Sequence, residues 1–225
     1  NNSSVFKKLE TKTLFLGPKQ ERIKFIKKKK SRQILKLDEK VKIMLFGCFN
    51  LDNPLKGGEI LKECLNIFVS KLKKNKNFSK YLGKITLLTF GNKNSFEVSI
   101  SGIKWLHLGI INSDKKLNLL YRASDLLVCP STVDNGPHIV SEALLNNLPV
   151  IAFNQGVAQD CIENGKNGYL VPCYDKKIFS SSIFKALFLD KKKLKKNKIS
   201  LIFNSSNEAK TIIKHAKNDL KIKNS

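Results

Sequence analysis

The sequence predicts an α/β protein with a Rossmann-like, mostly parallel sheet flanked by helices. Short apolar runs of strand length alternate with segments whose apolar residues recur at helical spacing. In the clearest unit, within residues 121–172, an apolar run at 126–129 ends at Pro130, a helical pattern begins at His138, and a second apolar run occupies 149–153. This is a strand–loop–helix–strand order. A chain of 225 residues is also long enough to bury the core of one such domain.

The same alternation divides the chain into four parts. Residues 1–17 form a short segment that ends in a strand over 13–17. Residues 18–40 form a basic linker, whose lysine run at 27–30 is typical of a solvated segment. The main domain is expected over 41–205 and a C-terminal helix over 206–225.

Further elements are expected inside the main domain. A helix that begins at Lys56-Gly57-Gly58 has apolar residues near i, i+4 spacing, which predicts a core-facing stripe: Ile60, Cys64, Leu65, Phe68 and Leu72. Other strands are expected over 41–47, 85–91 and 105–109, and other helices near 117–121 and over 178–189 and 191–203. The C-terminal helix is expected to carry a second apolar stripe: Ala209, Ile212, Ile213, Ala216 and Leu220.

The chain is strongly basic, with a formal net charge of +24 and a pI of about 9.9. Arginine occurs only at Arg22, Arg32 and Arg122, so nearly all of the basic residues are lysines. Nucleic-acid binding favours arginine for bidentate and stacking contacts, so we expect no nucleic-acid partner. A lysine-rich composition indicates compositional bias of the genome first, and peripheral contact with an anionic membrane second.

The cysteines and the hydropathy suggest a reduced compartment. The five cysteines are odd in number, scattered and without a C-x-x-C pair, which predicts neither a disulfide framework nor a zinc site. No apolar run is long enough to span a bilayer, and no signal peptide is recognised. We therefore expect a cytoplasmic protein whose only membrane contact is peripheral, on the inner face. The chain also lacks the glycine patterns of dinucleotide-binding and P-loop proteins.

Two acids lie where a ligand of an open α/β sheet is expected to bind. Asp134 is in the loop after the strand at 126–129, and Glu142 follows eight residues later in the helix. A carboxylate can accept hydrogen bonds from two neighbouring sugar hydroxyls. Amides around Asn135, Gly136 and His138, at the start of the helix, suit a phosphate. Together these groups suit a nucleotide sugar; the alternative is a surface turn with Asp134 in a local bond and Glu142 in solvent.

Several spaced motifs in this region resemble the donor-binding region of retaining glycosyltransferases of family 4, which have the GT-B fold. The motifs are Pro130-Ser131, the pair Asp134 and Glu142, Glu142-Ala143, Asn147-Leu148-Pro149-Val150, Asn154-Gln155-Gly156 and Asn167-Gly168-Tyr169-Leu170-Val171. The chain departs from the family at four places, one of which is the turn at 154–157, with one glycine where two are frequent. Asp134 replaces the usual Glu, Asn147 replaces a common Gly, and Cys48-Phe49 stands after Gly47 where an arginine is frequent.

The resemblance implies a function and a role for each of these residues. The family transfers a sugar, with retention, from a nucleoside diphosphate sugar to an acceptor, here a glycan or a lipid-linked sugar in cell-surface polysaccharide synthesis. Asp134 and Lys56 would be the catalytic residues, holding the sugar hydroxyls and the diphosphate. Glu142 would bind the ribose, Asn135, Gly136 and His138 the phosphates, and Gly109 and Ile111 the base.

A lysine at a helix N-terminus is unfavourable for the helix dipole, so the position of Lys56 independently favours an anionic ligand. The resemblance implies no metal and no cofactor besides the donor. It makes 41–205 the donor-binding domain and 1–17 the end of an acceptor domain, the rest of which would be a preceding domain or separate chain. The alternative is a nucleotide-sugar-binding module without transfer activity of its own.

Overall fold

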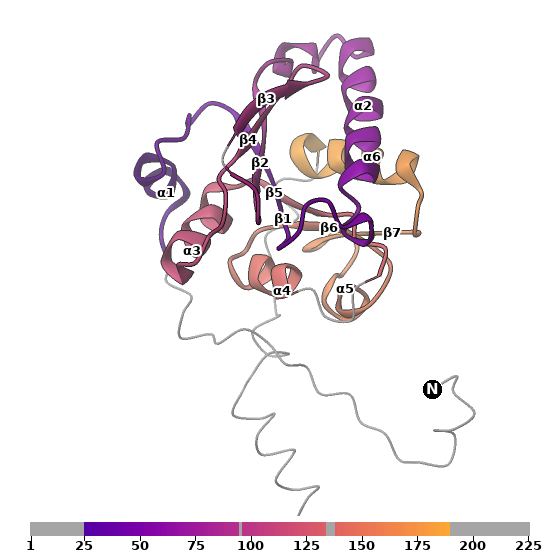
Figure 1. Cartoon of the computed structure of the whole chain (residues 1–225). Helices are drawn as coiled ribbons and strands as arrows, with labels where there is room; N and C mark the ends of the chain where they lie inside the picture. The colour runs from indigo at the N-terminus through magenta and orange to yellow at the C-terminus, as the bar shows by residue number, and fades with distance from the viewer. Residues whose placement is uncertain (1–24, 95, 134–137, 190–225) are drawn as a thin grey trace, which may run out of the picture.

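The computed structural model describes residues 25–94, 96–133 and 138–189 (Figure 1). Its centre is a seven-stranded sheet in the order β3-β4-β2-β1-β5-β6-β7. Strand β3 is antiparallel to β4, and every other neighbouring pair is parallel. The strands are β1 (Lys42–Gly47), β2 (Ile85–Phe90), β3 (Phe96–Ile100), β4 (Ile103–His107), β5 (Leu126–Cys129), β6 (Val150–Phe153) and β7 (Gly168–Val171). The predicted fold class is confirmed.

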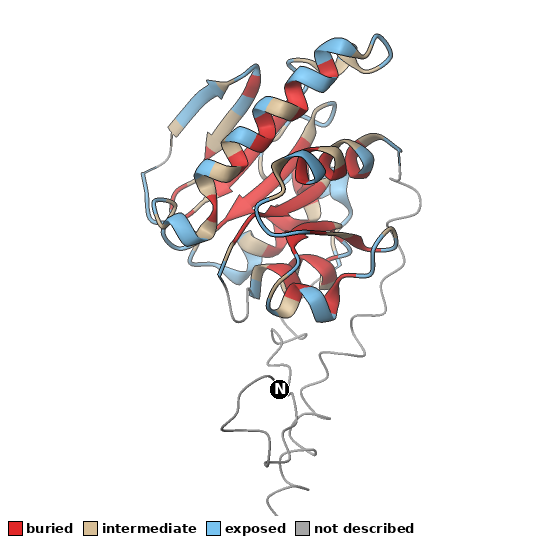
Figure 2. Ribbon diagram, turned by 90° about the vertical axis from the view of Figure 1, so that its right-hand side faces the viewer, coloured by how far each residue is buried: buried red, intermediate tan, exposed pale blue. Residues whose placement is uncertain are grey.

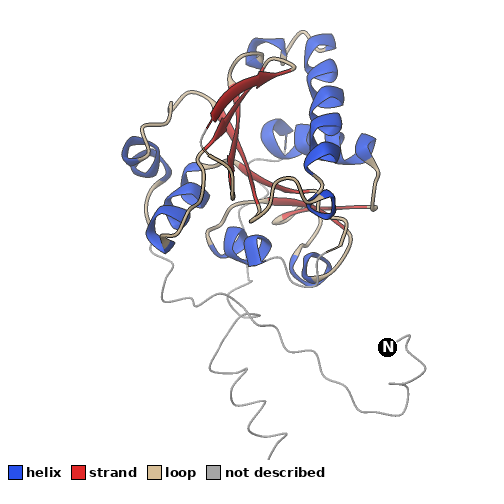
Figure 3. Ribbon diagram, viewed as in Figure 1, coloured by secondary structure: helices blue, strands red, loops and turns tan. Residues whose placement is uncertain are grey.

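Helices cover both faces of this sheet (Figure 3). They are α1 (Lys28–Ile34), α2 (Gly58–Lys74), α3 (Asp114–Ala123), α4 (His138–Leu145), α5 (Val157–Cys161) and α6 (Lys176–Phe184), with short 3-10 helices at Pro54–Lys56 and Ser79–Tyr81 and a π-helical turn at Lys185–Leu189. Helices α2 and α6 contribute to one apolar core cluster, and α3, α4 and α5 to the other. The predicted strand–loop–helix–strand unit is therefore β5, α4 and β6.

The central strand β1 shows why an apolar run of strand length predicted a doubly covered sheet. Met44 and Phe46 belong to the cluster beneath α2 and α6, whereas Ile43 and Leu45 belong to the cluster beneath α3, α4 and α5. Successive side chains of a strand point to opposite faces, so a strand buried on both faces must be apolar throughout. Figure 2 shows this buried layer through the centre of the molecule.

One hairpin at the edge of the sheet is not predicted by the sequence pattern. Ser101 and Gly102 both have positive φ, 54° and 85°, and join β3 to β4. Strand β3 is exposed along most of its length, so it lacks the continuous apolar run by which the inner strands are recognised. The strand predicted at 105–109 forms two residues earlier, as β4.

The described part of the predicted linker contains a docked helix rather than a wholly solvated segment. Helix α1 packs on α3, and the Arg32 side chain is 5% exposed. Its Nε donates to the carbonyl of Ala123 (2.9 Å), and its Nη1 donates to the carbonyls of Glu39 (2.8 Å) and Val41 (3.0 Å). Its Nη2 lies 2.7 Å from Asp125 Oδ2. The guanidinium therefore joins α1 to the start of β5.

Several predictions lie outside the described residues. These are the strand at 13–17, the helix at 191–203 and the apolar stripe of the C-terminal helix. The division of the chain at residues 17, 40 and 205 accordingly stays a prediction.

Candidate functional site

The strand order places a crevice beside β1. The chain runs from β1 outward through β2 to β4, and then returns to the other side of β1 as β5. Loops that leave the carboxyl ends of β1 and β5 therefore diverge, and ligands of open α/β sheets bind at such a point. A pocket of about 300 Å³ lies there, lined by Lys56 from the β1 side and by Ser131, His138 and Glu142 from the β5 side.

Lys56 is positioned by a tight connection between β1 and α2. Asn53 Oδ1 accepts from the amide of Leu55 (3.0 Å) and caps the short 3-10 helix that ends at Lys56. Gly57 then adopts φ 74°, and a Cβ there would overlap the carbonyl oxygen of Pro130. Only glycine allows this combination of positive φ and close approach.

The same connection is joined to the loop that follows β5. The amide of Thr132 donates to the carbonyl of Leu55 (2.9 Å), and Gln155 Nε2 donates to the carbonyl of Ser131 (2.7 Å). Ser131 is buried. The backbone bond between Thr132 and Leu55 thus holds side by side two segments that are far apart in the sequence and predicted to act together, and the Gln155 side chain fixes the loop after β5 from the other side.

Glu142 lies in the second turn of α4 and forms a hydrogen bond with α3. The hydroxyl of Tyr121 donates to Glu142 Oε2 at 2.6 Å. Burial, and to a lesser extent the charge of Asp114, raise the pKa of Glu142 above its usual value, although the bond from Tyr121 and the nearby His138 act to lower it. Burial, and then the charge of Glu142, raise the pKa of Tyr121 well above its usual range, so its hydroxyl is a donor at neutral pH. Glu142 is therefore partly buried and hydrogen-bonded rather than fully solvated, whereas the local bond considered for Asp134 lies outside the described residues.

The other predicted residues divide into three groups. His138 begins α4 and is exposed on the pocket wall. Gly109 and Ile111 follow β4 at the same edge of the sheet, where the amide of Gly91 donates to the carbonyl of Gly109 (3.0 Å), but neither residue lines the pocket. Asp134, Asn135 and Gly136 lie outside the described residues, so their placement stays a prediction.

Some pocket residues are not predicted from the sequence. Cys48 and Phe49, which stand where the family often has an arginine, line the wall next to Lys56. Burial raises the pKa of the Cys48 thiol to about 11, so this wall carries a neutral thiol instead of a second cation. For Tyr121 the sequence predicts only a helix, because no local pattern indicates its bond to Glu142. Gly47 is the last residue of β1, and residues that follow the carboxyl end of a strand border the ligand site in open α/β sheets. This position could have indicated that Cys48 and Phe49 line the pocket.

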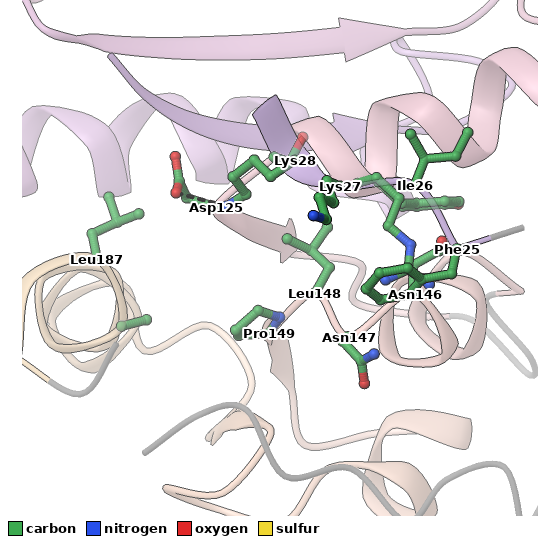
Figure 4. Close-up of a pocket in the computed structure, with 14 residues that line it drawn as sticks. Phe25, Ile26, Lys27, Lys28, Asp125, Asn146, Asn147, Leu148, Pro149 and Leu187 are labelled. Atoms are coloured by element: carbon green, nitrogen blue, oxygen red, sulfur yellow. Dashed lines mark hydrogen bonds and ion pairs between the residues drawn. The ribbon is translucent and has the colours of Figure 1, made fainter. Parts of the chain in front are cut away.

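A second cavity, of about 470 Å³, lies at the amino ends of β5 and β6 (Figure 4). Leu187 and Phe25 lie at opposite sides of it, with Leu148 between them. Lys28 reaches Asp125 at its edge, with 2.9 Å between Nζ and Oδ1. Of the predicted donor-binding residues that the structure describes, none lines this cavity. It lies toward the opposite ends of the strands from the candidate site, and Tyr121 lines both cavities.

No group of three or more His, Cys, Asp or Glu that could hold a metal ion occurs among the residues that the structure describes. Within the same part of the chain, no helix combines the length and the apolar character that crossing a bilayer requires.

Comparisons with solved structures place this fold among glycosyltransferases. The sucrose-phosphate synthase of Thermosynechococcus elongatus is 18% identical, with a TM-score of 0.70 over 92% of this chain. This chain spans only 52% of that synthase chain. HepE of Anabaena, solved with UDP and glucose, is 19% identical, with a TM-score of 0.62 over 89% of this chain and 55% of that chain.

A domain solved by itself shows which half of such enzymes is matched. The C-terminal domain of LpcC, a group 1 glycosyl transferase of Francisella tularensis, is 18% identical, with a TM-score of 0.63. The match covers 84% of this chain and 98% of that domain. None of the curated proteins matches the chain.

The sequence model described as "Glycosyl transferases group 1" matches residues 56–201, a range that begins at Lys56 and contains the whole β5–α4–β6 unit. This range exceeds half of the chain, and the predicted resemblance is confirmed. The protein belongs to the group 1 glycosyl transferases, and its fold is that of the C-terminal domain of GT-B glycosyltransferases.

Proposed function

We propose that the chain is the donor-binding part of a retaining glycosyltransferase that moves a sugar from a nucleoside diphosphate sugar to a glycan or lipid-linked acceptor in cell-surface polysaccharide synthesis. The observation that carries this proposal is the pocket between β1 and β5, in which Lys56, His138 and Glu142 meet. A cation, a hydrogen-bonding imidazole and a carboxylate within one pocket match the phosphates and the ribose of a nucleotide.

Each residue has a defined part in the proposed reaction. Lys56 and the amides at the start of α4 stabilise the negative charge that develops on the departing diphosphate. Glu142 accepts hydrogen bonds from the ribose hydroxyls, and His138 donates to a phosphate oxygen. Asp134 holds the hydroxyls of the transferred sugar, while Gly109 and Ile111 contact the base. The presence of UDP and glucose in the HepE structure supports a uridine nucleotide as the first donor to test.

The second candidate is a nucleotide-sugar-binding module without transfer activity of its own. It is supported by the extent of the match, because the chain spans about half of the synthase chain. A transfer assay with UDP-, GDP- and ADP-sugars and glycan acceptors separates the two candidates. Nucleotide binding without transfer supports the module, and transfer supports the enzyme.

Replacing Glu142 by alanine is expected to weaken binding of a nucleoside diphosphate by about 1–3 kcal/mol, which is typical for the loss of a hydrogen bond to a charged group. Isothermal titration with UDP, GDP and ADP measures the change. Glu97→Gln is the matched control, because Glu97 lies on the edge strand β3 and pairs with Lys104 (2.9 Å). An unchanged affinity for every nucleotide that binds the wild type would show that Glu142 does not bind the donor.

We also propose peripheral contact with an anionic membrane. Exposed lysines gather at the C-terminal end of α2 and in the segment that follows it: Lys71, Lys73, Lys74, Lys76, Lys80 and Lys84. Clustered lysines are attracted to anionic lipid by about 1 kcal/mol each near the surface. Co-sedimentation with phosphatidylglycerol vesicles should decrease as salt rises and as these lysines are replaced by glutamine, while phosphatidylcholine vesicles should not bind. Equal binding to both kinds of vesicle would contradict this contact.

A further inference from the structure

Tyr121 and Glu142 connect two helices directly beside the proposed donor. Tyr121 lies near the C-terminal end of α3 and is 2% exposed, and its hydroxyl is 2.6 Å from Glu142 Oε2. Both residues line the pocket that contains Lys56. A carboxylate can only accept hydrogen bonds, so the phenol is the donor.

Glu142 is therefore restrained at more than one point. The backbone carbonyl of Glu142 accepts from Asn146 Nδ2 at 3.0 Å, which holds the helix next to the side chain. Helices α3 and α4 pack into the same apolar cluster, in which Leu120 and Tyr121 meet Val140 and Ala143. A glutamate side chain that is already ordered loses less conformational entropy when it binds a ligand.

The bond also leaves part of the carboxylate available to a ligand. Oε2 is occupied by Tyr121, whereas Oε1 has no hydrogen-bond donor among the residues that the structure describes. The pKa of Glu142 is raised overall by burial, but the hydrogen bond from Tyr121 lowers it and so favours the ionised carboxylate. An ionised carboxylate can accept from both hydroxyls of a diol, but a protonated one has lost part of this capacity.

We propose that Tyr121 is a positioning residue, which orients the carboxylate of Glu142 for recognition of the ribose diol of the donor. This inference rests on the proposed function, in which Glu142 binds the ribose. It adds a residue from α3, outside the β5–α4–β6 unit, whose hydroxyl acts on the donor only through Glu142.

The test is Tyr121→Phe, which keeps the ring and removes the hydroxyl. The probes are whichever of UDP, GDP and ADP binds the wild type most tightly and its 2′-deoxy analogue, titrated from pH 5 to pH 8. At pH 7 the variant should bind the ribonucleotide about 5- to 10-fold more weakly, because one hydrogen bond to a charged group is lost. The affinity for the 2′-deoxy analogue should fall by about twofold or less, since it lacks one diol hydroxyl.

The pH profile separates positioning from a purely structural role. Protonation of Glu142 on acidification is expected to weaken binding, and loss of the Tyr121 bond should raise the pKa of Glu142. His138 and Asp114, which also act on the Glu142 carboxyl, are present in both proteins, so the difference between the two pH profiles reports the Tyr121 bond. The fall in affinity on acidification should therefore begin at a higher pH in the variant. Tyr81→Phe, at a ring that packs on Phe188 in the other core cluster, should leave both the affinity and the profile unchanged.

Two controls make each outcome interpretable. In a Glu142→Gln background, Tyr121→Phe should have no further effect on affinity, because the two residues act as one unit. The role of Tyr121 is overturned if affinity is half lost at the same pH in Tyr121→Phe and the wild type, or if the ribonucleotide and its 2′-deoxy analogue lose affinity equally. In that case a weaker affinity of Glu142→Gln would still support the proposed function. A Glu142→Gln variant with wild-type affinity overturns the proposed function itself.

If the Phe variant does not fold, 3-fluorotyrosine provides a second measurement. Fluorination makes the phenol a stronger hydrogen-bond donor, so the pH at which nucleotide affinity is half lost should be lower than in the wild type. If this pH is unchanged in the fluorinated protein, the role of Tyr121 is overturned.

Discussion

Replacing Arg32 by methionine is expected to lower the free energy of unfolding by about 3–5 kcal/mol, the usual cost of removing one partner of a buried ion pair. Methionine fills much of the same space, but it donates no hydrogen bond. The change leaves the carbonyls of Ala123, Glu39 and Val41 without the guanidinium and leaves the Asp125 carboxylate without its nearest cation, 2.7 Å away. Urea denaturation followed by circular dichroism measures the loss.

Lys29→Met is the matched control on the same helix. Lys29 is 73% exposed and lies 3.7 Å from Glu39 Oε2, so its removal should change the free energy of unfolding by about 1 kcal/mol or less. Combining Arg32→Met with Asp125→Asn should recover part of the loss, because it removes a buried carboxylate that has lost one of its two cations and keeps only Lys28, 2.9 Å away. Equal effects of Arg32→Met and Lys29→Met would mean that α1 is not anchored to the domain through Arg32.

The same pair predicts an acid-dependent loss of stability. Burial by itself raises the pKa of Asp125, but Lys28, the amide of Ile43 and Arg32 outweigh it, so that the pKa is lower than usual. A group with a lowered pKa in the folded state stabilises the fold above its unfolded pKa of about 4, and this contribution is lost as pH falls through the folded value. The difference in stability between wild type and Asp125→Asn should therefore shrink as pH falls below about 4.

Replacing Lys56 by alanine is expected to weaken binding of a nucleoside diphosphate by about 1.5–3 kcal/mol, roughly 10- to 150-fold, and to leave binding of the nucleoside nearly unchanged. Only the diphosphate carries the anionic oxygens that the ammonium would contact. Lys56 lies just before the first turn of α2, and its side chain lines the pocket. Its charge acts to lower the pKa of the Cys48 thiol, so the ammonium lies close to this wall of the pocket. Calorimetric titration of both ligands measures the difference.

Lys73→Ala with Lys74→Ala is the matched control for net charge. Helix α2 has 17 residues and is therefore about 25 Å long, which separates these lysines from the pocket by far more than the Debye length of about 8 Å. The control should bind the diphosphate with wild-type affinity. Equal losses for nucleoside and diphosphate in Lys56→Ala, or a larger loss in the control, would rule out a diphosphate contact.

The central part of the fold could be predicted from local patterns. The strand at 126–129, the helix from His138 and the strand at 149–153 have periodicity and breakers that do not depend on distant residues. The observed β5, α4 and β6 agree with them closely. The edge strand β3 could not be recognised in this way, because its exposed face carries polar residues and its other neighbour is solvent.

The candidate site could be predicted only in part. Lys56, His138 and Glu142 were identified from spacing and resemblance, and the structure brings these three to one pocket. Gly109 and Ile111 follow the carboxyl end of β4, as expected for the ligand side of the sheet, but they do not line that pocket. The wall formed by Cys48 and Phe49 could be noted in the sequence as a departure from the family, but its position beside Lys56 depends on the connection between β1 and α2.

The sequence by itself determined the fold class and the family, because periodicity, turn chemistry and motif spacing are properties of neighbouring residues. Only the tertiary structure decided that Tyr121 bonds Glu142, 21 residues away, and that Arg32 bonds Asp125, 93 residues away. The physical reason is the same in both cases. A buried polar group must find a partner wherever packing brings one, and packing joins residues that share no local pattern.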